Sequence, residues 1–293
     1  MTAHVLSLHR YPVKSMLGEE LAACVVGERG LVGDRAYALL DADDGIVASA
    51  KNPRKWAALL TMSARFTAEP AVGSPPPVEV TLPDGVVVDS RDSDVDARLS
   101  VAVGRPVRLI TEHPGVAQFE EVWPDLDGLA PLDFIESTRS GTEPGGEAIS
   151  TMPLGLLAPP ETFFDLATVH LLTTSTLAHL AELGAGADFD PRRYRPNVLV
   201  GTGDPGFVED DWVGRAVALG DDLRLDVSML TMRCVMTTLA QRDLPGDAST
   251  LRTLARHHRR EIPGLGTWAC AGVYAGVGRA GTVRVGDRVS LMQ

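Results

Sequence analysis

Residues 233–238 read Arg233-Cys234-Val235-Met236-Thr237-Thr238, and the interpretation of the whole chain depends on this stretch. A cysteine thiolate is a soft ligand that suits soft metals and molybdenum. The adjacent Arg233 is expected to lower the pKa of the Cys234 thiol and so to favour the thiolate. The same pattern fits a strand over residues 234–238 in which Cys234 is a small core residue, so both interpretations stay open here.

The other two cysteines, Cys24 and Cys270, lie in plainer apolar segments, and we interpret both as core residues. Three cysteines make an odd number, and no two of them form a CxxC pair. This pattern argues against a disulfide framework, a structural zinc site and a self-contained iron–sulfur cluster, which normally takes about four cysteines. It indicates a reduced, cytoplasmic compartment.

Charge and composition narrow the class of protein. The net charge of −12 argues against a nucleic-acid binder, because neutralising phosphates needs a basic face. The N-terminus lacks the pattern of a signal peptide, and no run approaches the roughly 18 apolar residues of a membrane span. No HExxH, GxSxG or Walker motif occurs. We therefore expect a cytoplasmic globular protein that binds neither nucleic acid nor membranes.

Short β-rich segments bounded by Gly and Pro predict an α+β, β-rich fold. The N-terminal part, residues 1–115, is expected to form a β-barrel-like domain. Its strands are predicted at residues 5–8, 21–26, 37–40, 78–82, 86–88 and 107–110. Residues 111–162 lose any sustained period, which predicts an irregular connecting segment, placed at residues 116–160.

The C-terminal part, residues 161–293, predicts a second β-barrel with flanking helices. Apolar residues at helical spacing predict helices over residues 173–184 and from residue 249 onward. Strands are expected at residues 169–172, 198–200, 217–219, 223–229, 234–238, 268–274 and 282–291, the last interrupted by a turn at Gly286-Asp287.

Three further polar clusters could bind an anion or a polar heterocycle. Lys14 and Ser15 follow a strand and a proline, so they could hold a phosphate or simply form a solvated turn. Arg35 follows glycines that permit a close approach. Arg195 and Asn197 precede a buried strand and present planar hydrogen-bonding groups suited to a pterin, or else form an ordinary strand start.

These clusters occur together and in a recognisable order. The chain resembles the MOSC superfamily, named for the C-terminal domain of molybdenum cofactor sulfurase, preceded by its N-terminal β-barrel partner domain. In plan it is similar to the mitochondrial amidoxime-reducing component and its bacterial relatives. The matching residues are Tyr11-Pro12-Val13-Lys14-Ser15, Gly33-Asp34-Arg35, Leu171-Leu172-Thr173, Arg195-Pro196-Asn197, Arg233-Cys234-Val235-Met236-Thr237-Thr238 and Gly281-Thr282-Val283-Arg284-Val285-Gly286-Asp287.

The resemblance implies a molybdenum cofactor (Mo-molybdopterin) bound between an N-terminal and a C-terminal β-barrel. It implies that Cys234 is the metal ligand and the catalytic residue. The implied cofactor-binding residues are Lys14, Ser15 and Arg35 for the phosphate, Arg195 and Asn197 near the pterin, and Arg233, Thr173, Thr174 and Ser175 beside it. A family-level association with pyridoxal phosphate binding comes with the same resemblance.

The implied activity is reduction of an N-hydroxylated or N-oxygenated small molecule. No ferredoxin-like domain follows the last predicted strand, so we expect a separate electron-donor protein, such as a ferredoxin or a flavoprotein. The alternative from another class is a non-redox module that uses Cys234 to carry sulfur or to deliver the cofactor. A third interpretation is a structural member of the superfamily in which Cys234 belongs to the core.

Overall fold

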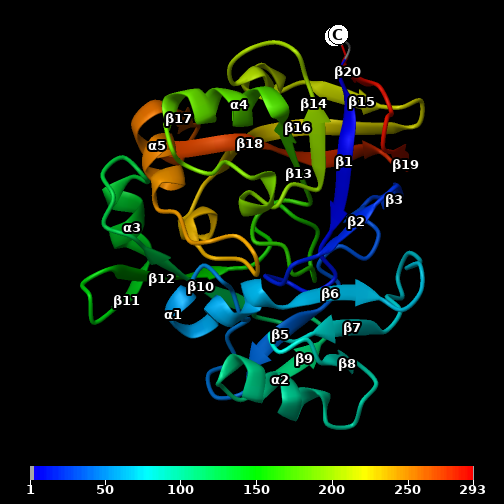
Figure 1. Cartoon of the computed structure of the whole chain (residues 1–293), viewed down its shortest axis with the longest axis vertical. Helices are drawn as coiled ribbons and strands as arrows, with labels where there is room; N and C mark the ends of the chain where they lie inside the picture. Colours follow the sequence, from blue (N-terminus) through cyan, green and yellow to red (C-terminus); the bar gives the residue numbers. More distant parts are fainter. Residues whose placement is uncertain (1–2, 293) are drawn as a thin grey trace.

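The structure, a computed structural model, describes residues 3–292 and is α+β and β-rich, as predicted. Its largest element is a nine-stranded sheet in the upper half of Figure 1. The strands follow the order β2 (Glu19–Leu21), β1 (His4–Arg10), β14 (Val198–Gly201), β13 (Val169–Thr173), β18 (Gly266–Arg279), β16 (Leu223–Met232), β15 (Ala216–Leu219) and β20 (Val289–Leu291), and β17 (Arg259–Ile262) pairs with β18.

Two predicted helices, α4 (Thr174–Leu183) and α5 (Ser249–His257), pack against this sheet. In α5 the buried side chains include Leu251 and Leu254, which the helical spacing of the sequence had placed on one face. Helix α4 begins at the N-cap Thr173 and ends at Gly184. It connects β13 to β14, which are parallel neighbours and therefore require a crossover connection.

The N-terminal part has its own smaller sheets and its own hydrophobic core in the lower half of Figure 1. One sheet contains β6 (Ser63–Phe66), β7 (Val78–Thr81) and β8 (Val87–Asp89), and another pairs β5 (Ala38–Asp41) with β9 (Val107–Ile110). Three short helical elements, which the sequence analysis did not predict, complete it: α1 (Pro53–Trp56), η1 (Ala57–Thr61) and α2 (Val95–Val103).

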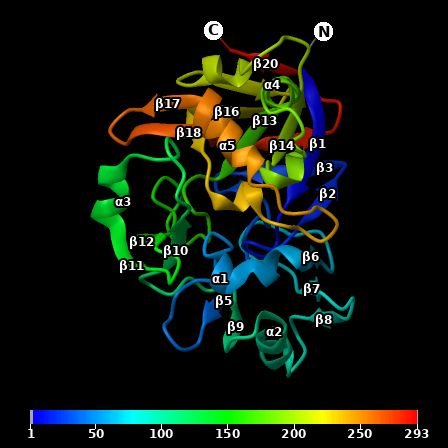
Figure 2. The same cartoon turned by 60° about the vertical axis from the view of Figure 1, so that its left-hand side comes forward.

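The expectation of irregular structure over residues 111–162 was wrong. This segment contains a three-stranded sheet of β10 (Gln118–Trp123), β12 (Ala148–Pro153) and β11 (Arg139–Thr142), together with α3 (Leu132–Thr138). The side chains of Trp123 and Phe119 are buried, so the segment contributes core as well as surface. Its position beside α1 and below β17 and β18 is visible in Figure 2.

The strand expected over residues 234–238 was also wrong. β16 ends at Met232, and residues 235–238 form the 3-10 helix η4 (Val235–Thr238). The turn closes because the Thr237 backbone N–H and hydroxyl both donate to the Cys234 carbonyl, at 3.3 and 3.1 Å. A threonine hydroxyl that bonds to a nearby carbonyl competes with strand pairing.

The two halves of the chain share their sheets. β1, at the start of the chain, pairs with β14 of the C-terminal part, with Leu8 opposite Val198. Conversely, β19 (Gly281–Arg284) pairs with β3 (Ala23–Gly27), which also pairs with β4 (Gly30–Leu31). The loop after β1 is therefore held directly beside the C-terminal sheet, where the candidate site lies.

Within residues 3–292, we find no helix whose length and apolar character would let it cross a membrane.

Candidate functional site

Cys234 lies between the end of β16 and the start of η4, at a point fixed by the backbone on both sides. The Arg233 N–H donates to the Ala269 carbonyl of β18 at 2.8 Å, and the Cys234 carbonyl begins the η4 turn. The Cys234 residue itself is partly exposed, whereas Cys24 and Cys270 are buried. Of the three cysteines, Cys234 is the one accessible to a ligand.

Cys234 contributes to the walls of two neighbouring cavities. The first, which we call the basic cavity, has a volume of about 80 Å³ and is lined by the side chains of Lys14, Arg35, Lys51, Arg193, Arg195 and Arg233 and by one carboxylate, that of Asp165. The second, which we call the apolar cavity, has a volume of about 250 Å³ and carries mostly aromatic and aliphatic side chains. Their common walls are Lys51, Asp165, Met232, Arg233, Cys234 and Tyr274.

The N-terminal part supplies Lys14, Ser15 and Arg35 to the basic cavity from two neighbouring turns. The Lys14 N–H donates to the Tyr37 carbonyl at 2.9 Å, and the Arg35 N–H donates to the Tyr11 carbonyl at 2.7 Å. These bonds join the two turns, so the three side chains are presented together to the C-terminal sheet.

Three residues of the basic cavity have a backbone conformation that non-glycine residues rarely adopt. The φ angles of Ser15, Arg35 and Arg195 are 64°, 50° and 55°, in the left-handed region. Such conformations cost about 1–3 kcal/mol each and concentrate at functional sites, where the surrounding structure maintains them. Their clustering around one cavity is an argument, independent of sequence motifs, that this cavity is a functional site.

Burial controls the charges inside the basic cavity. Desolvation lowers the pKa of Lys14 to about 8, although its ion pair with Asp165 opposes that shift. Burial alone would raise the pKa of Asp165, but Lys14 and Lys51 outweigh it and lower that pKa. Because Asp165 is the only carboxylate among the described lining residues, the cavity keeps an excess of positive charge.

The guanidinium group of Arg195 is buried with both terminal nitrogens, Nη1 and Nη2, unpartnered within residues 3–292. It stacks on the Tyr11 ring at 4.1 Å, and burial lowers its pKa to about 10. Arg233 likewise has an unpartnered Nε, while its Nη2 donates to the Tyr194 carbonyl at 2.9 Å. Buried cationic donors without acceptors are costly, so this cavity suits an anionic, acceptor-rich group such as a phosphate.

The thiol of Cys234 differs from expectation in its pKa. Burial and, to a smaller extent, the nearby Glu121 carboxylate raise the pKa to about 11, although Lys51 and Arg233 oppose that shift. Arg233 therefore acts in the predicted direction, but desolvation is the larger effect. In the absence of a bound metal the thiol is protonated at neutral pH, and a coordinating cation is what would favour the thiolate.

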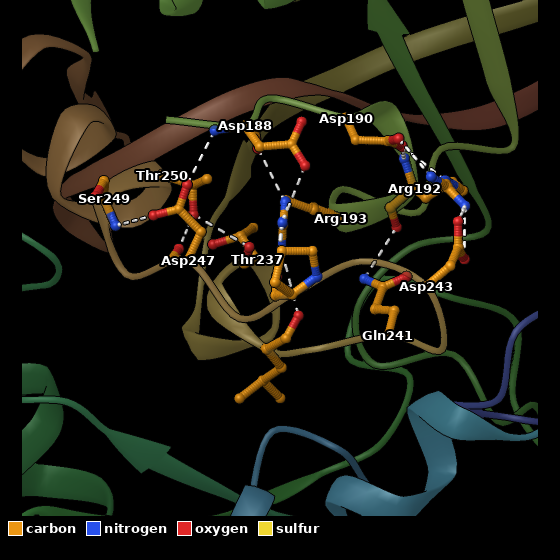
Figure 3. Close-up of polar contacts among 12 residues, drawn as sticks. Asp188, Asp190, Arg192, Arg193, Thr237, Gln241, Asp243, Asp247, Ser249 and Thr250 are labelled. Atoms are coloured by element: carbon orange, nitrogen blue, oxygen red, sulfur yellow. Dashed lines mark hydrogen bonds and ion pairs between the residues drawn. The ribbon is translucent and has the colours of Figure 1, made fainter. Parts of the chain in front are cut away.

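A network of arginines and carboxylates surrounds Arg193, one of the residues that line the basic cavity (Figure 3). The fully buried Arg193 donates to the carbonyls of Asp188 at 2.9 Å and Pro245 at 2.8 Å. Arg192 pairs with Asp190 and Asp243, at 2.7 and 3.1 Å. These contacts attach the loop after η4 to η2 (Pro191–Arg193), the element directly before Arg195. Asp188 and Asp190 serve as ion-pair partners in this network.

Four predicted site residues lie outside both cavities. Thr173 caps α4 and donates to Glu209 at 2.6 Å, and Thr174 and Ser175 bond to the loop at residues 202–204. The buried Asn197 side chain links β13 to the turn that contains Asp34: it accepts from the His170 N–H at 3.1 Å and donates to the Asp34 carboxylate at 2.9 Å. The roles implied for these residues beside the pterin stay predictions.

Several residues near Cys234 were missed because nothing in their local sequence indicates them. Lys51 lies between two predicted elements. Glu121 falls inside the segment that was expected to be irregular, and Asp165 lies between that segment and the strand predicted at residues 169–172. Lys51 pairs with Glu121 at 3.2 Å and with Asp165 at 3.5 Å. His170 and Tyr274 are in correctly predicted strands. That they lie opposite each other follows only from the pairing of β13 with β18, which the sequence does not reveal.

Two family models match separate parts of the chain. The model of the MOSC domain matches residues 160–290, and that of the MOSC N-terminal beta barrel domain matches residues 2–73. The chain therefore contains a MOSC domain preceded by the MOSC N-terminal β-barrel domain. The family is associated with the molybdenum cofactor, which agrees with the fit of the basic cavity to an anionic ligand.

Two solved structures are similar to this chain over different extents. The YuaD protein from Bacillus subtilis is 12% identical, with 99% of this chain and 96% of that chain covered, at a TM-score of 0.45. YiiM from Geobacillus stearothermophilus is 15% identical, with 43% of this chain and 55% of that chain covered, at a TM-score of 0.31. Among curated proteins, no sequence matches significantly.

Proposed function

We propose that the protein is a molybdenum-cofactor-dependent oxidoreductase that reduces N-hydroxylated or N-oxygenated small molecules. The observation that carries the proposal is the position of Cys234, which lines both the basic cavity and the apolar cavity. The basic cavity suits the anionic cofactor, and the apolar cavity suits an organic substrate. A separate electron-donor protein is part of the proposal.

In this proposal, the chain holds the cofactor from both of its halves. Cys234 would ligate the metal, Lys14, Ser15 and Arg35 would bind the phosphate, and Arg195 and Arg233 would bind the remaining polar groups. The unpartnered nitrogens of Arg195 support this assignment, since an anionic acceptor would satisfy them. When bound, the molybdenum cofactor supplies a metal that accepts an oxygen atom and exchanges two electrons.

The protein's own residues position and shield the reacting groups. Arg233 and Lys51 place positive charge near the Cys234 sulfur and so favour its ionised form once a metal is bound. The aromatic walls of the apolar cavity exclude water from the face of Cys234 that a substrate would approach. The protein thereby contributes binding, orientation and electrostatic field, while the cofactor supplies the redox chemistry.

The direct test measures molybdenum and pterin in the full-length protein purified from a cofactor-competent host. We expect near-stoichiometric metal in the wild type, and loss of metal in Cys234→Ala with retention of the fold, because the side chain is only partly buried. Reduction of an N-hydroxylated amidine by the wild type, with a chemically reduced viologen as electron source, is expected to be abolished in the same variant.

The matched control is Cys24→Ala, which removes a thiol from a core position outside both cavities and should retain metal and turnover. Turnover that survives Cys234→Ala would overturn the mechanism. Well-folded wild type that binds neither metal nor pterin would favour the sulfur-carrier or the structural interpretation.

A further inference from the structure

The apolar cavity is built largely by the segment that the sequence analysis had considered irregular. Phe119 and Trp123 come from β10, Phe134 from α3 and Met152 from β12, while Trp268 comes from β18 of the main sheet. Cys234 is part of the same wall. A molecule in this cavity would therefore be next to the thiol on which the proposed function depends.

Three aromatic rings form one fixed cluster in this wall. Phe134 meets Trp268 edge-on at 4.9 Å between ring centroids and Trp123 edge-on at 6.0 Å, and the two tryptophans are 5.9 Å apart. Offset and edge-on arrangements are the favourable geometries for aromatic pairs. The aromatic ring of a ligand in the apolar cavity could pack against this cluster in the same offset or edge-on geometry.

The polar groups of these rings are already used. The Trp123 indole N–H donates to the Ser150 hydroxyl at 2.8 Å, and the Trp268 indole N–H donates to the Leu265 carbonyl at 2.8 Å. The cluster consequently offers carbon surface and ring faces rather than hydrogen-bond donors. Selectivity here must come from shape and from stacking.

The charges at the end of the cavity near Cys234 balance. Two cations, Lys51 and Arg233, accompany two carboxylates, Glu121 and Asp165, among the described lining residues. Lys51 bridges both carboxylates, at 3.2 Å to Glu121 and 3.5 Å to Asp165. The formal charges of these four side chains sum to zero, so an ionised ligand would lose its hydration in this cavity without meeting an excess of opposite charge.

We infer that the apolar cavity is the substrate site and that it selects compact, uncharged molecules that carry an aromatic ring, with the ring against Trp123, Phe134 and Trp268. The inference rests on the proposed function, because that function places the reaction at Cys234. The cavity volume of about 250 Å³ suits one ring with a small polar group. Drug-sized ligands usually need about 300–1,000 Å³.

The test measures binding rather than turnover, in the full-length protein as purified, by calorimetry and by tryptophan fluorescence. The probes are N-hydroxybenzamidine, N-hydroxyacetamidine, which has the same polar group without the ring, and benzoate, which has the ring with a negative charge. We expect N-hydroxybenzamidine to bind at least about tenfold more tightly than N-hydroxyacetamidine and to perturb the fluorescence of Trp123 and Trp268.

The diagnostic variant is Phe134→Ala, and Ile135→Ala on the same helix is its matched control, because Ile135 is partly buried but lines neither cavity. Loss of the edge-on contacts should weaken N-hydroxybenzamidine binding about tenfold in Phe134→Ala and leave it unchanged in Ile135→Ala. Near-ultraviolet circular dichroism of both variants reports whether the fold is retained.

Equal affinity for the two N-hydroxylated probes, or equal losses in the two variants, would overturn the inference. Benzoate that binds as tightly as N-hydroxybenzamidine and responds equally to Phe134→Ala would overturn its charge selectivity. Binding as expected without any reduction of the probe would contradict the proposed function while supporting the site. The two proposals can therefore fail separately.

Discussion

Arg193 and Arg195 are two residues apart and similarly hidden from solvent, yet they have opposite hydrogen-bonding surroundings. The guanidinium of Arg193 donates to several backbone carbonyls and pairs with Asp188, whereas the terminal nitrogens of Arg195 have no acceptor within the described residues. The first arrangement stabilises the fold. The second leaves the positive charge of Arg195 without an acceptor, which an anionic ligand would supply.

Replacing these two arginines should have different effects: Arg193 is expected to matter for the stability of the fold and Arg195 for binding of the cofactor. Arg195→Met is expected to raise the free energy of unfolding of the cofactor-free protein by about 1–2 kcal/mol, because it removes an unpartnered buried charge. Arg193→Met is expected to lower it by about 3 kcal/mol, because it leaves carbonyls and a carboxylate without their donor. Chemical denaturation measures both, and equal destabilisation by the two variants would contradict the assignment. Arg195→Met should also retain less cofactor.

Cys234 shows what residue-level sequence reasoning can and cannot predict. The neighbouring Arg233 correctly predicts a pKa-lowering influence on the thiol. The sequence cannot reveal the depth of burial or the approach of Glu121, which is 113 positions away and raises that pKa. The net direction depends on contacts between distant segments, so it follows only from the folded chain.

Among the helices and strands, the sequence predicts those in which apolar residues recur at the positions that the fold buries. β16 begins with a regular alternation of buried and exposed residues, and α4 and α5 each bury leucines at helical spacing, Leu180 in α4 and Leu251 and Leu254 in α5. Each of these elements was found near its predicted position. The sequence of residues 111–162 shows no such period, because polar residues such as Glu121 and Ser150 occupy buried strand positions and α3 buries no residue completely. Its structure depends on Trp123 and Phe134 packing against Trp268 of the main sheet.

Thr173 allows a test at the scale of one element. Its hydroxyl accepts from the Thr176 N–H at 3.1 Å at the start of α4, and neither cavity includes it. Thr173→Ala should therefore lower the free energy of unfolding by about 1–2 kcal/mol through loss of the N-cap, without reducing molybdenum content. Cys234→Ala should show the reverse pattern. Loss of metal from well-folded Thr173→Ala would instead support the role implied by the resemblance.

For the whole molecule, the important feature is that the sheets cross the division between the two halves. β1 completes the C-terminal sheet beside β14, and β19 completes the N-terminal sheet beside β3. The sequence predicts the two parts but not this exchange, because strand pairing is not encoded in local periodicity. The same exchange brings Lys14, Ser15, Arg35, Arg195, Arg233 and Cys234, which the sequence analysis singled out, to one cavity.

Shared sheets predict that the two halves unfold together. Trp56 is buried in the N-terminal core and Trp268 in the C-terminal core, so single-tryptophan versions of the protein report on each half. We expect both reporters and far-ultraviolet circular dichroism to give coincident denaturation curves. Two transitions separated in denaturant concentration would show that the halves fold independently.

The walls common to the basic and apolar cavities have a consequence for how their occupants influence each other. Lys51 contacts Asp165 on one side and Glu121 on the other. A ligand in one cavity that shifts Lys51 changes the counter-charge available to the occupant of the other. For such a ligand, thermodynamic linkage requires that each occupant alter the affinity for the other by the same factor, with Lys51 as the side chain that connects the two cavities.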